Sequence, residues 1–503
     1  LAMSDSTGRE LNYGSALIGS LLLSRLIQKY CRDDSLVGLL LPASVAGALA
    51  NVAVLLAGKV PVNLNFTAGQ EAMASAIQQC GIHTIISSRT FLAPAKLDET
   101  KGMIFLEDLA KQLTPLQKAV TGLLAFLLPS RLLGDLYRPA KLDSNTLATV
   151  IFSSGSTGTP KGVMLSHHNI LSNIEAIAQI FWITNQDRMM GVLPFFHSFG
   201  LTGTLWFPLI AGFGVVYHSN PMDAKTIGEM VAKYKTTILI STPTFYAAYL
   251  RRCTAEEFST LHYAIVGAEK LREPVAKAFK EKYGLDLLEG YGCTEMGPVV
   301  AVNIPDVQEG REHQTGLKPG TVGHPVPGVA AKVVNPDTGE MLPPGDEGLL
   351  LVKGPNRMMG YLGEPQKTAE VSKDSWYITG DIASIDDDGF IRITDRLSRF
   401  SKIGGEMVPH IKVEEAINQI LGDQSCVVTS IPDEQKGERL VVFYTRNATE
   451  PQELWDKLNQ TDLPKLWIPK RENFYCVEAI PLLGSGKADL KKAKTMAMER
   501  VGG

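Results

Sequence analysis

The chain lacks the features that mark disulfide-stabilised and nucleic-acid-binding proteins. Its six cysteines lie far apart in sequence, and no pair has the Cys-x-x-Cys spacing. This spacing argues against a disulfide framework or structural zinc and favours a reducing, cytoplasmic compartment. The sequence has no zinc-finger spacing and no long basic run, and its net charge of −4 gives no overall attraction to nucleic acid. We therefore expect no nucleic-acid partner.

The chain also lacks a clear membrane span and a secretion signal. No charged residue occurs between Ser35 and Gly58, but Pro42 interrupts this stretch. We predict a strand at Leu36–Leu41 and a helix at Ser44–Leu56, which together form a buried strand-helix unit. The first ten residues are polar, so no signal peptide is expected, and the missing initiator methionine suggests a processed or excised module.

A second apolar run, Val120–Leu128, is too short to span a bilayer and is followed by Pro129. The sequence leaves three interpretations open for it: burial in the core, contact with lipid, or the wall of an apolar channel. On the lipid interpretation, serine at Leu124 and Phe126 reduces liposome binding without unfolding the protein.

Length and periodicity predict the fold class. A chain of 503 residues, 45% of them hydrophobic, is long enough for two or three domains. Strand-like and helix-like runs alternate from residue 36 to 300, and a β-rich stretch follows from Gly320 to Ile393. We predict an α/β protein with a large N-terminal domain of stacked α/β layers that includes a β-rich subdomain. A small mobile α+β domain is expected at the C-terminus.

The decapeptide Ser153–Gly162 (SSGSTGTPKG) has the composition of a phosphate-binding loop. Its glycines, its hydroxyl side chains and Lys161 can surround a polyphosphate with hydrogen-bond donors. A Walker A loop is excluded, because that motif opens a helix, whereas Thr149–Phe152 and Val163–Leu165 are both predicted as strands. A flexible turn of a β-hairpin is the alternative interpretation.

Four further motifs follow this loop along the chain. They are Pro194–Gly200 (PFFHSFG), Gly290–Glu295 (GYGCTE), Tyr377–Asp381 (YITGD) and Leu483–Lys487 (LGSGK). In this order the motifs resemble those of the adenylate-forming superfamily, which contains acyl-CoA synthetases, peptide-synthetase adenylation domains and luciferases. Two further segments look most like one branch, the acyl-acyl carrier protein synthetase module of the bifunctional 2-acylglycerophosphoethanolamine acyltransferase. These segments are Gly267–Leu271 and Asp395–Val408.

The resemblance implies a site for ATP and Mg²⁺. It implies that Glu295 binds the magnesium ion, for which a hard oxygen donor is suited, and that Thr294 contacts the α-phosphate. Tyr291 is expected to stack on adenine, Asp381 to accept both ribose hydroxyls, and Arg396 to donate to the ribose or phosphate edge. The predicted nucleotide-binding residues are Ser153, Ser154, Gly155, Ser156, Thr157, Gly158, Thr159, Lys161, Gly267, Ala268, Glu269, Gly290, Tyr291, Gly292, Thr294, Asp381 and Arg396.

Four residues are expected to be catalytic by the same resemblance: Lys487, Thr157, Glu295 and His197. Lys487 would neutralise negative charge in the transition state, and Thr157 would lie closest to the reacting phosphate. His197 would line the acyl or thiol path, although a packed core histidine fits the sequence nearly as well. Cys293 lies inside a motif, but a nucleophilic role for its thiol is not favoured.

The family's hinge motif predicts a domain boundary after Arg396. The N-terminal adenylation domain would comprise residues 1–396, and residues 397–503 would form a lid that carries Lys487 and closes for catalysis. Ser398 stands where many family members have an aspartate, which puts the detailed transfer of hinge mechanics in doubt.

The predicted function is ATP-dependent activation of a fatty acid to an acyl adenylate. The acyl group would then pass to the phosphopantetheine thiol of acyl carrier protein, for phospholipid reacylation. A long-chain acyl-CoA synthetase and a fatty acyl adenylate ligase are the alternatives; a luciferase-like oxygenase and a non-catalytic acyl-binding protein are less favoured. The chain has no His-x4-Asp acyltransferase motif, so a lysophospholipid acyltransferase would be a missing domain or a separate protein.

Two expectations concern the surroundings of the protein. We expect a cytoplasmic protein that makes peripheral contact with the inner face of the membrane. A local excess of basic residues is predicted to dock an acidic carrier protein, with a solvated basic hinge as the alternative. These residues are Arg392, Arg396, Arg399, Lys402 and Lys412.

Overall fold

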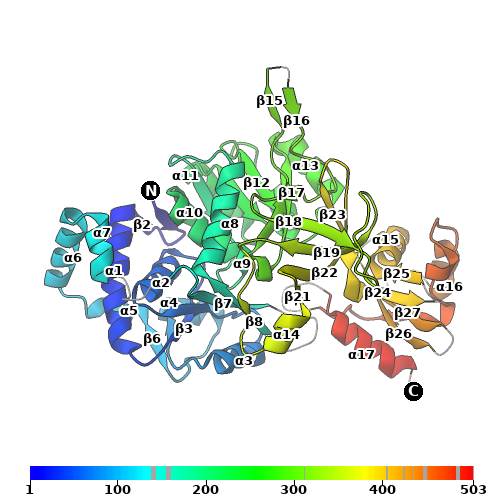
Figure 1. Cartoon of the computed structure of the whole chain (residues 1–503), viewed down its shortest axis with the longest axis horizontal. Coiled ribbons are helices and arrows are strands. Elements are labelled where there is room, and N and C mark those ends of the chain that lie inside the picture. Colours follow the sequence, from blue (N-terminus) through cyan, green and yellow to red (C-terminus); the bar gives the residue numbers. More distant parts are fainter. Residues whose placement is uncertain are drawn as a thin grey trace.

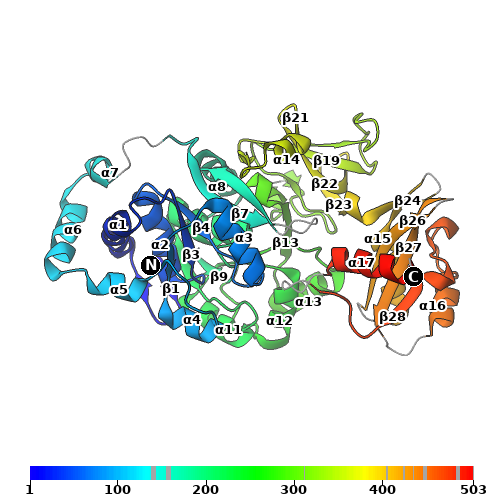
Figure 2. The same cartoon turned by 90° about the horizontal axis from the view of Figure 1, so that it is seen from below.

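The structure is a computed structural model of the chain (Figure 1). It describes residues 1–137, 143–153, 160–310, 312–403, 406–422, 425–433, 436–445, 450–482 and 488–501. Layers of strands and helices come first, a β-rich part follows, and a small part with strands and helices ends the chain. Figures 1 and 2 both place this last part at the opposite end of the molecule from helix α1, Tyr13–Tyr30.

The largest sheet of the described residues has nine strands in the order β17, β14, β13, β12, β11, β9, β10, β1, β2. Strands β1, β10, β9, β11, β12 and β13 run parallel, so their carboxyl ends meet at one edge. Three predicted motif segments lie at this edge. Pro194–Gly200 follows β9, Gly267–Leu271 follows β12, and Gly290–Glu295 begins at the end of β13. The strand bounds are β1 Met3–Asp5, β2 Glu10–Leu11, β9 Arg188–Gly191, β10 Gly214–Tyr217, β11 Ile238–Ser241, β12 Tyr263–Val266, β13 Leu287–Gly292, β14 Val299–Val302 and β17 His324–Pro325.

A second, parallel sheet contains the strand predicted at Leu36–Leu41. Its strands are, in spatial order, β4 Val60–Asn63, β3 Leu36–Leu40, β5 Ile85–Ser87 and β6 Met103–Phe105. Helix α2, Val45–Leu56, follows β3, and Ser44 Oγ caps it by accepting the N–H of Gly47 at 3.1 Å. The buried strand-helix unit is confirmed.

Helices cover both sheets. Those in the α/β part are α3 Gln70–Cys80, α4 Arg89–Ala95, α5 Leu106–Lys111, α6 Pro115–Leu127, α7 Ser130–Tyr137, α8 His167–Ile180, α9 Ser198–Gly200, α10 Phe207–Ala211, α11 Ala224–Tyr234, α12 Pro243–Arg252 and α13 Glu273–Tyr283. A π-helix, Leu201–Trp206, connects α9 to α10, and a 3₁₀ turn, Thr294–Met296, follows β13.

Antiparallel strands form the β-rich part. One sheet comprises β18 Ala330–Val334, β19 Gly348–Lys353, β21 Ser372–Lys373, β22 Trp376–Ile385 and β23 Ile391–Arg396, with α14 at Pro365–Glu370. Another comprises β7 Leu147–Ser153, β8 Lys161–Ser166 and β20 Gly360–Tyr361. The hairpin of β15 Val307–Glu309 and β16 Glu312–Gln314 projects from the molecule (Figure 1).

The C-terminal part is a sheet with helices on both sides. Its elements are β24 Phe400–Ile403, β25 Glu406–Pro409, α15 His410–Leu421, β26 Cys426–Asp433, β27 Gly437–Thr445, α16 Pro451–Leu458, β28 Phe474–Val477 and α17 Leu490–Val501. Val442 of β27 packs with α15 and α16, whereas its neighbour Val441 packs with α17. The predicted fold class is confirmed. The boundary after Arg396 and the mobility of this part stay predictions.

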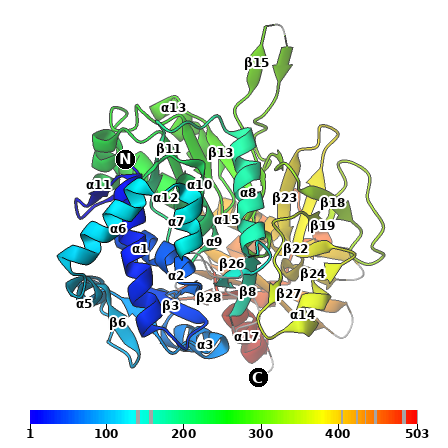
Figure 3. The ribbon, with the colours of Figure 1, turned by 60° about the vertical axis from the view of Figure 1, so that its left-hand side comes forward.

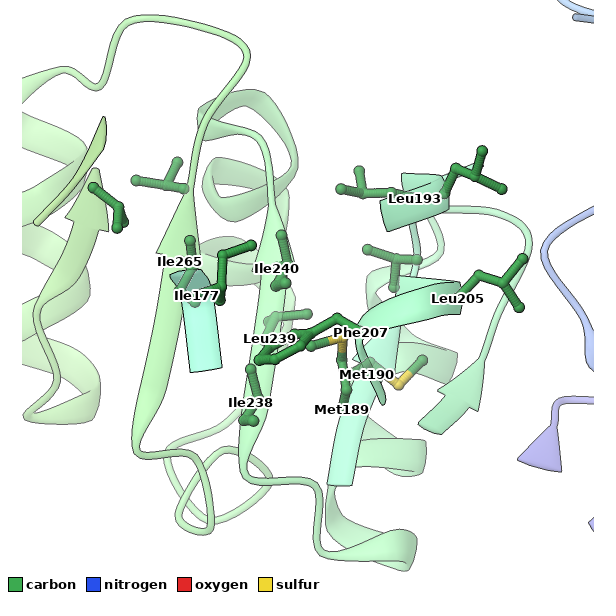
Figure 4. Close-up of a cluster of buried hydrophobic side chains, with 14 of the residues drawn as sticks. Ile177, Met189, Met190, Leu193, Leu205, Phe207, Ile238, Leu239, Ile240 and Ile265 are labelled. Atoms are coloured by element: carbon green, nitrogen blue, oxygen red, sulfur yellow. The ribbon is translucent and has the colours of Figure 1, made fainter. Parts of the chain in front are cut away.

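The main core lies between the nine-stranded sheet and its helices. Figure 4 shows Met190 of β9 and Leu239 of β11 close to Phe207 of α10, and all three side chains are buried. Each such side chain stabilises the fold by about 1.5 to 3 kcal/mol. Because parallel strands covered on both faces are buried throughout, β10, β11 and β12 are nearly continuous apolar runs and not alternating ones.

The apolar run Val120–Leu128 has two different faces in α6. Leu124 packs with buried Leu21 and Tyr137, whereas Leu123 and Phe126 are 58% and 87% exposed. The core interpretation is therefore wrong for the outer face and correct for the inner one. No helix of the described residues is long and apolar enough to cross a bilayer.

The two faces predict different costs for neighbouring leucines. Leu124→Ala should lower the free energy of unfolding by about 2 kcal/mol, at the low end of the range for buried leucine because this side chain is partly exposed. Leu123→Ala, the matched control, should change it by less than about 0.5 kcal/mol. Urea unfolding followed by circular dichroism measures both, and equal losses would contradict the orientation of α6.

Candidate active site

The hairpin β7–β8 confirms that the decapeptide is not a Walker A loop. Ser153 ends β7 and pairs with Lys161, which begins β8, so a strand and not a helix follows the loop. The remaining predicted phosphate ligands lie outside the described residues, and their roles, including the catalytic role of Thr157, stay predictions. They are Ser154, Gly155, Ser156, Thr157, Gly158 and Thr159.

Lys161 and Glu295 meet at one tyrosine. The hydroxyl of Tyr361 donates a hydrogen bond to Glu295 Oε1 at 2.9 Å. Lys161 Nζ lies 5.1 Å from the centre of the same ring, because β20 pairs with β8 and places Tyr361 opposite Val163. The carboxylate predicted to bind magnesium and a cation predicted to bind phosphate therefore contact the same side chain.

The turn that carries Glu295 is fixed from two sides. Thr294 Oγ1 lies 3.3 Å from the hydroxyl of Ser198, which belongs to the motif Pro194–Gly200. The backbone N–H of Met358 donates to the Glu295 carbonyl at 2.7 Å, and Asn356 Nδ2 donates to the Met296 carbonyl at 2.6 Å. Two predicted motifs and the segment before β20 thus converge at this turn.

The glycines of the site allow close backbone contacts. A Cβ at Gly267 would lie 3.3 Å from the Gly290 carbonyl and 3.4 Å from the ring of Phe199. A Cβ at Gly292 would lie 2.2 Å from the carbonyl of Pro298, so only glycine fits there. Three motif segments therefore pack against one another at the carboxyl edge of the large sheet.

The residues after Gly267 are held in a tight loop. Ala268 has a φ of 68°, in the left-handed region that few non-glycine residues adopt. Glu269 Oε2 accepts the hydroxyl of Thr244 at 2.6 Å. Glu289, on the neighbouring strand β13, accepts the N–H of Leu271 at 2.9 Å and closes the loop from the other end.

Asp381 binds two other predicted site residues. It accepts a short hydrogen bond from the hydroxyl of Tyr291 at Oδ2 and a bond of 2.8 Å from Arg396 Nε at Oδ1. Burial and the Asp381 carboxylate raise the pKa of Tyr291 well above its usual value, so its hydroxyl is a donor at neutral pH. Asp381 is 4% exposed and Arg396 is 61% exposed, so the guanidinium covers the carboxylate.

The aromatic-histidine segment is only partly buried. Phe195 and Phe196 are buried, and Phe196 contacts Phe66 edge to face with ring centres 5.0 Å apart. His197 is exposed and precedes α9. The packed-core alternative for His197 is therefore wrong, and its place on the acyl or thiol path stays a prediction.

Cys293 is not an activated thiol. Burial raises its pKa well above the usual value, and the carboxylates of Glu295 and Asp381 raise it further. Because the thiolate is the nucleophilic form, this environment disfavours covalent catalysis at Cys293.

The hinge segment corrects the predicted basic patch. Arg399 is 17% exposed and forms an ion pair with Glu414, which also accepts the N–H of Val428 at 2.7 Å. Arg396 is paired with Asp381, so neither arginine is part of a free basic surface. Burial raises the pKa of the adjacent Asp395 to about 6. Arg392 and Lys412 are exposed, as predicted.

The catalytic lysine predicted at Lys487 lies outside the described residues. Leu482 and Ala488, which flank the Leu483–Lys487 motif, form an antiparallel bridge. Across the two parts of the chain, Lys270 and Glu415 of α15 form an ion pair of 2.9 Å.

The donor set fits a magnesium ion that is bound partly by phosphate. Within the described residues, no group of three or more histidine, cysteine, aspartate or glutamate side chains could hold a metal. Glu295 is a single carboxylate beside a turn, and magnesium usually takes one or two protein carboxylates with phosphate oxygens and water.

Comparison with known protein families decides the assignment. Residues 2–362 match the AMP-binding enzyme family, and residues 412–487 match the AMP-binding enzyme C-terminal domain. The chain belongs to the AMP-binding enzyme family. The bifunctional acyltransferase branch is not distinguished by these matches.

Curated relatives of this AMP-binding enzyme include CoA ligases and a CoA synthase. It is 31% identical over 341 residues to a long-chain-fatty-acid–CoA ligase of Bacillus subtilis, an alignment that covers 66% of this chain and 59% of that protein. It is 32% identical over 355 residues to a feruloyl-CoA synthase of an Amycolatopsis species, covering 69% of each. The alignments to the long-chain-fatty-acid–CoA ligases span between 54% and 59% of those proteins.

Solved structures agree on the fold over nearly all of this chain. ATP-bound MatB from Rhodopseudomonas palustris superimposes with a TM-score of 0.82 at 25% identity, covering 100% of this chain and 96% of that one. The o-succinylbenzoate–CoA synthetase MenE from Bacillus subtilis, in complex with ATP and magnesium ion, gives a TM-score of 0.80 at 21% identity and covers 98% and 96%.

Sequence reasoning missed two residues of this AMP-binding enzyme. Tyr361 lies on a two-residue strand with no periodicity to reveal it, and its partner Glu295 is far away in sequence. Glu289 directly precedes a motif, and an acidic residue in a buried strand was the available signal. Burial raises the pKa of Glu289 to about 7, while the N–H of Leu271 and the charge of Lys270 lower it.

The raised pKa of Glu289 predicts a pH-dependent stability. The carboxyl group titrates near 4.5 when unfolded and near 7 when folded, so its protonated form is the one that folding favours. This contribution is complete below about pH 4.5 and is lost as the pH rises through about 7, a change of about 2 to 4 kcal/mol. Relative to the wild type, Glu289→Gln should therefore gain stability over that interval in urea unfolding. Parallel stability profiles would rule out a raised pKa.

Proposed function

We propose that the chain is an AMP-forming ligase that activates a fatty acid with ATP and Mg²⁺. Membership of the AMP-binding enzyme family and the long-chain-fatty-acid–CoA ligases among its relatives support this function. The observation that carries it is the cluster of Tyr291, Glu295 and Asp381 beside the loop of Lys161, which brings an acceptor for ribose and a ligand for magnesium to one edge of the sheet.

The residues of the site would bring two anions together. In the first step a carboxylate oxygen of the fatty acid attacks the α-phosphorus, and the bond to pyrophosphate breaks. Glu295 would bind magnesium together with phosphate oxygens, and Lys161 with Ser153 and the loop between them would bind the β- and γ-phosphates. Lys487 would approach with the C-terminal part and neutralise the charge that develops on the carboxylate and phosphate.

Asp381 would bind the ribose in this proposal. Its two oxygens have more lone pairs than the two donors that they now accept, so ribose hydroxyls can add to them. Because Arg396 covers this buried carboxylate, nucleotide binding would require its exposed guanidinium to turn aside. Tyr291, already oriented by Asp381, would then offer its ring to the adenine.

The second step would transfer the acyl group to a thiol. The phosphopantetheine thiolate attacks the acyl carbonyl, and AMP leaves. We propose acyl carrier protein as the acceptor, from the resemblance of Gly267–Leu271 and the hinge segment to carrier-protein synthetases, with phospholipid reacylation as the purpose. CoA is the second candidate, because the relatives are named as CoA ligases.

The proposal also includes a partner protein and a cellular location. A lysophospholipid acyltransferase, as a further domain or a separate protein, would consume the acyl product. The protein would be cytoplasmic and would contact the inner face of the membrane, since a fatty acid dissolves in a bilayer and must leave it to reach the site.

A pyrophosphate-exchange assay tests the first step. Wild-type protein, ATP, Mg²⁺ and a panel of carboxylic acids should give exchange that depends on a fatty acid. Competition between carrier protein and CoA for the acyl group then identifies the acceptor. Exchange with no acid of the panel would refute the ligase, and a clear preference for CoA would replace carrier protein as the acceptor.

Lys487 should be needed for one half-reaction only. Lys487→Ala should slow adenylation by about a hundredfold or more, the typical loss when one transition-state donor is removed. Acyl transfer from supplied acyl adenylate should persist. If both half-reactions fall equally, the role of Lys487 is wrong.

Glu295 and Tyr361 should act together on magnesium. Glu295→Gln removes one charge with little change in volume and should shift the magnesium titration of pyrophosphate exchange to higher concentrations. Tyr361→Phe removes only the hydrogen bond of 2.9 Å and should give a smaller shift in the same direction. Combining the two substitutions should add nothing to the effect of Glu295→Gln. Additive effects would show that Tyr361 does not act through Glu295.

A further inference from the structure

An apolar surface lies outside the candidate active site, on α6 and α7. Within α6, Leu116, Val120, Leu123 and Leu127 recur at the spacing of one helix side. An amphipathic helix normally turns such a stripe toward the core, but this stripe is exposed. The α6–α7 face comprises Leu116, Val120, Leu123, Phe126, Leu127, Leu132 and Leu136, with exposures from 43% to 87%.

Packing on the opposite side fixes the orientation of this face. Thr121 is fully buried, and Leu124 and Leu128 pack with buried Leu21 and Tyr137. Gly122 of α6 lies 3.8 Å, measured from an ideal Cβ, from Ile18 of α1. Because this inner side is occupied by α1, the α6–α7 face cannot turn inward without unpacking α6.

The charges around the α6–α7 face are mainly basic. Between Gln112 and Tyr137 the charged residues are Lys118, Arg131 and Asp135, and all three are exposed. Arg25 and Lys29 of α1 are exposed beside α6, where they line a surface pocket together with Gln117. An apolar stripe with basic residues along it is the pattern of helices that lie in the interface of an anionic bilayer.

The same charges argue against a second copy of the chain as the occupant. In a symmetric dimer each surface meets itself, so the excess of basic over acidic residues on one subunit would meet the same excess on the other. Like charges at an apolar interface are unfavourable, whereas anionic lipid headgroups would neutralise them.

A second apolar feature lies on α1, the helix that packs against α6. A cavity of about 310 Å³ is lined by α1, α2, α8 and α10, and its rim includes Leu17 and Ile210, which are 38% and 47% exposed. Leu17 directly precedes Ile18, the residue that Gly122 approaches. Figure 3 brings α1, α6, α7, α8 and α10 to the front of one view.

We propose that the α6–α7 face docks on an anionic lipid bilayer, with its leucines and Phe126 in the interface and Lys118 and Arg131 on the headgroups. Docking would bring the rim of the apolar cavity to the membrane surface. This inference deepens the proposed function, which needs fatty acid from a bilayer, but the docking itself requires neither ATP nor fatty acid.

Vesicle flotation with the full chain tests the proposal. The wild type should float with vesicles of phosphatidylcholine and phosphatidylglycerol and bind vesicles of pure phosphatidylcholine more weakly. Leu123→Glu combined with Phe126→Glu should abolish flotation. Met341→Glu is the matched control, because Met341 is 74% exposed on the β-rich part, and it should float as the wild type does.

A charge variant separates lipid binding from loss of folding. Lys118→Glu combined with Arg131→Glu leaves the apolar side chains in place and should weaken binding to anionic vesicles by at least about thirtyfold, since each basic residue near such a surface contributes about fivefold. Thermal unfolding of all variants should match the wild type, because every substituted side chain is exposed.

Three results would overturn the docking surface. These are no flotation of the wild type, unchanged flotation of the Leu123→Glu, Phe126→Glu variant, or a dimer in light scattering that this variant dissociates while vesicle binding persists. Vesicle binding by a protein that shows no pyrophosphate exchange with any acid would refute the proposed function and leave the docking surface standing.

Discussion

The carboxylate of Asp381 joins parts of the chain that are far apart in sequence. Its oxygens accept the hydroxyl of Tyr291, on the large sheet, and the guanidinium of Arg396, at the end of β23. A buried charge without donors is costly, so these two partners stabilise the carboxylate unless other donors replace them. The predicted adenine-binding ring, the predicted ribose acceptor and the residue before the hinge therefore hold one another in place.

The large sheet supplies the platform on which these contacts depend. Its parallel strands are apolar and buried on both faces, so polar residues gather where the strands end. Glycines at 267, 290 and 292 let those ends approach one another at backbone distance. Tyr361 connects these residues to the β7–β8 hairpin, because it donates a hydrogen bond to Glu295 and contacts Lys161. Tyr291, Glu295 and Asp381 are thus each held by a hydrogen bond, and in the proposed reaction Lys487 would approach them from the smaller C-terminal part.

Local sequence patterns predicted those elements whose structure depends on residues close together in the sequence. The uncharged run interrupted by Pro42 gave the strand-helix unit, because proline and length both disfavour a membrane helix. The residues around Ser153–Gly162 predicted a strand on each side of this segment, and the pairing of β7 with β8 confirms both strands.

Contacts between distant residues could not be predicted in this way. Arg399 was expected on a basic surface, but it forms a largely buried ion pair with Glu414 of α15. Helix α6 has apolar residues on both sides, so periodicity alone could not say that Leu124 packs inward and Leu123 outward. The hydrogen bond between Tyr361 and Glu295 depends on the pairing of β20 with β8. A strand of two residues is too short to be predicted from the sequence pattern.

The central claim is that Asp381 binds the ribose of a nucleotide at this edge of the sheet. Calorimetric titration of AMP and of 2′,3′-dideoxy-AMP into the wild type and into Asp381→Asn tests it directly. The wild type should prefer AMP by about tenfold or more, since hydrogen bonds to a charged acceptor contribute about 1.5 to 3 kcal/mol, and the variant should lose most of this preference. An equal preference for AMP in both proteins would contradict the account.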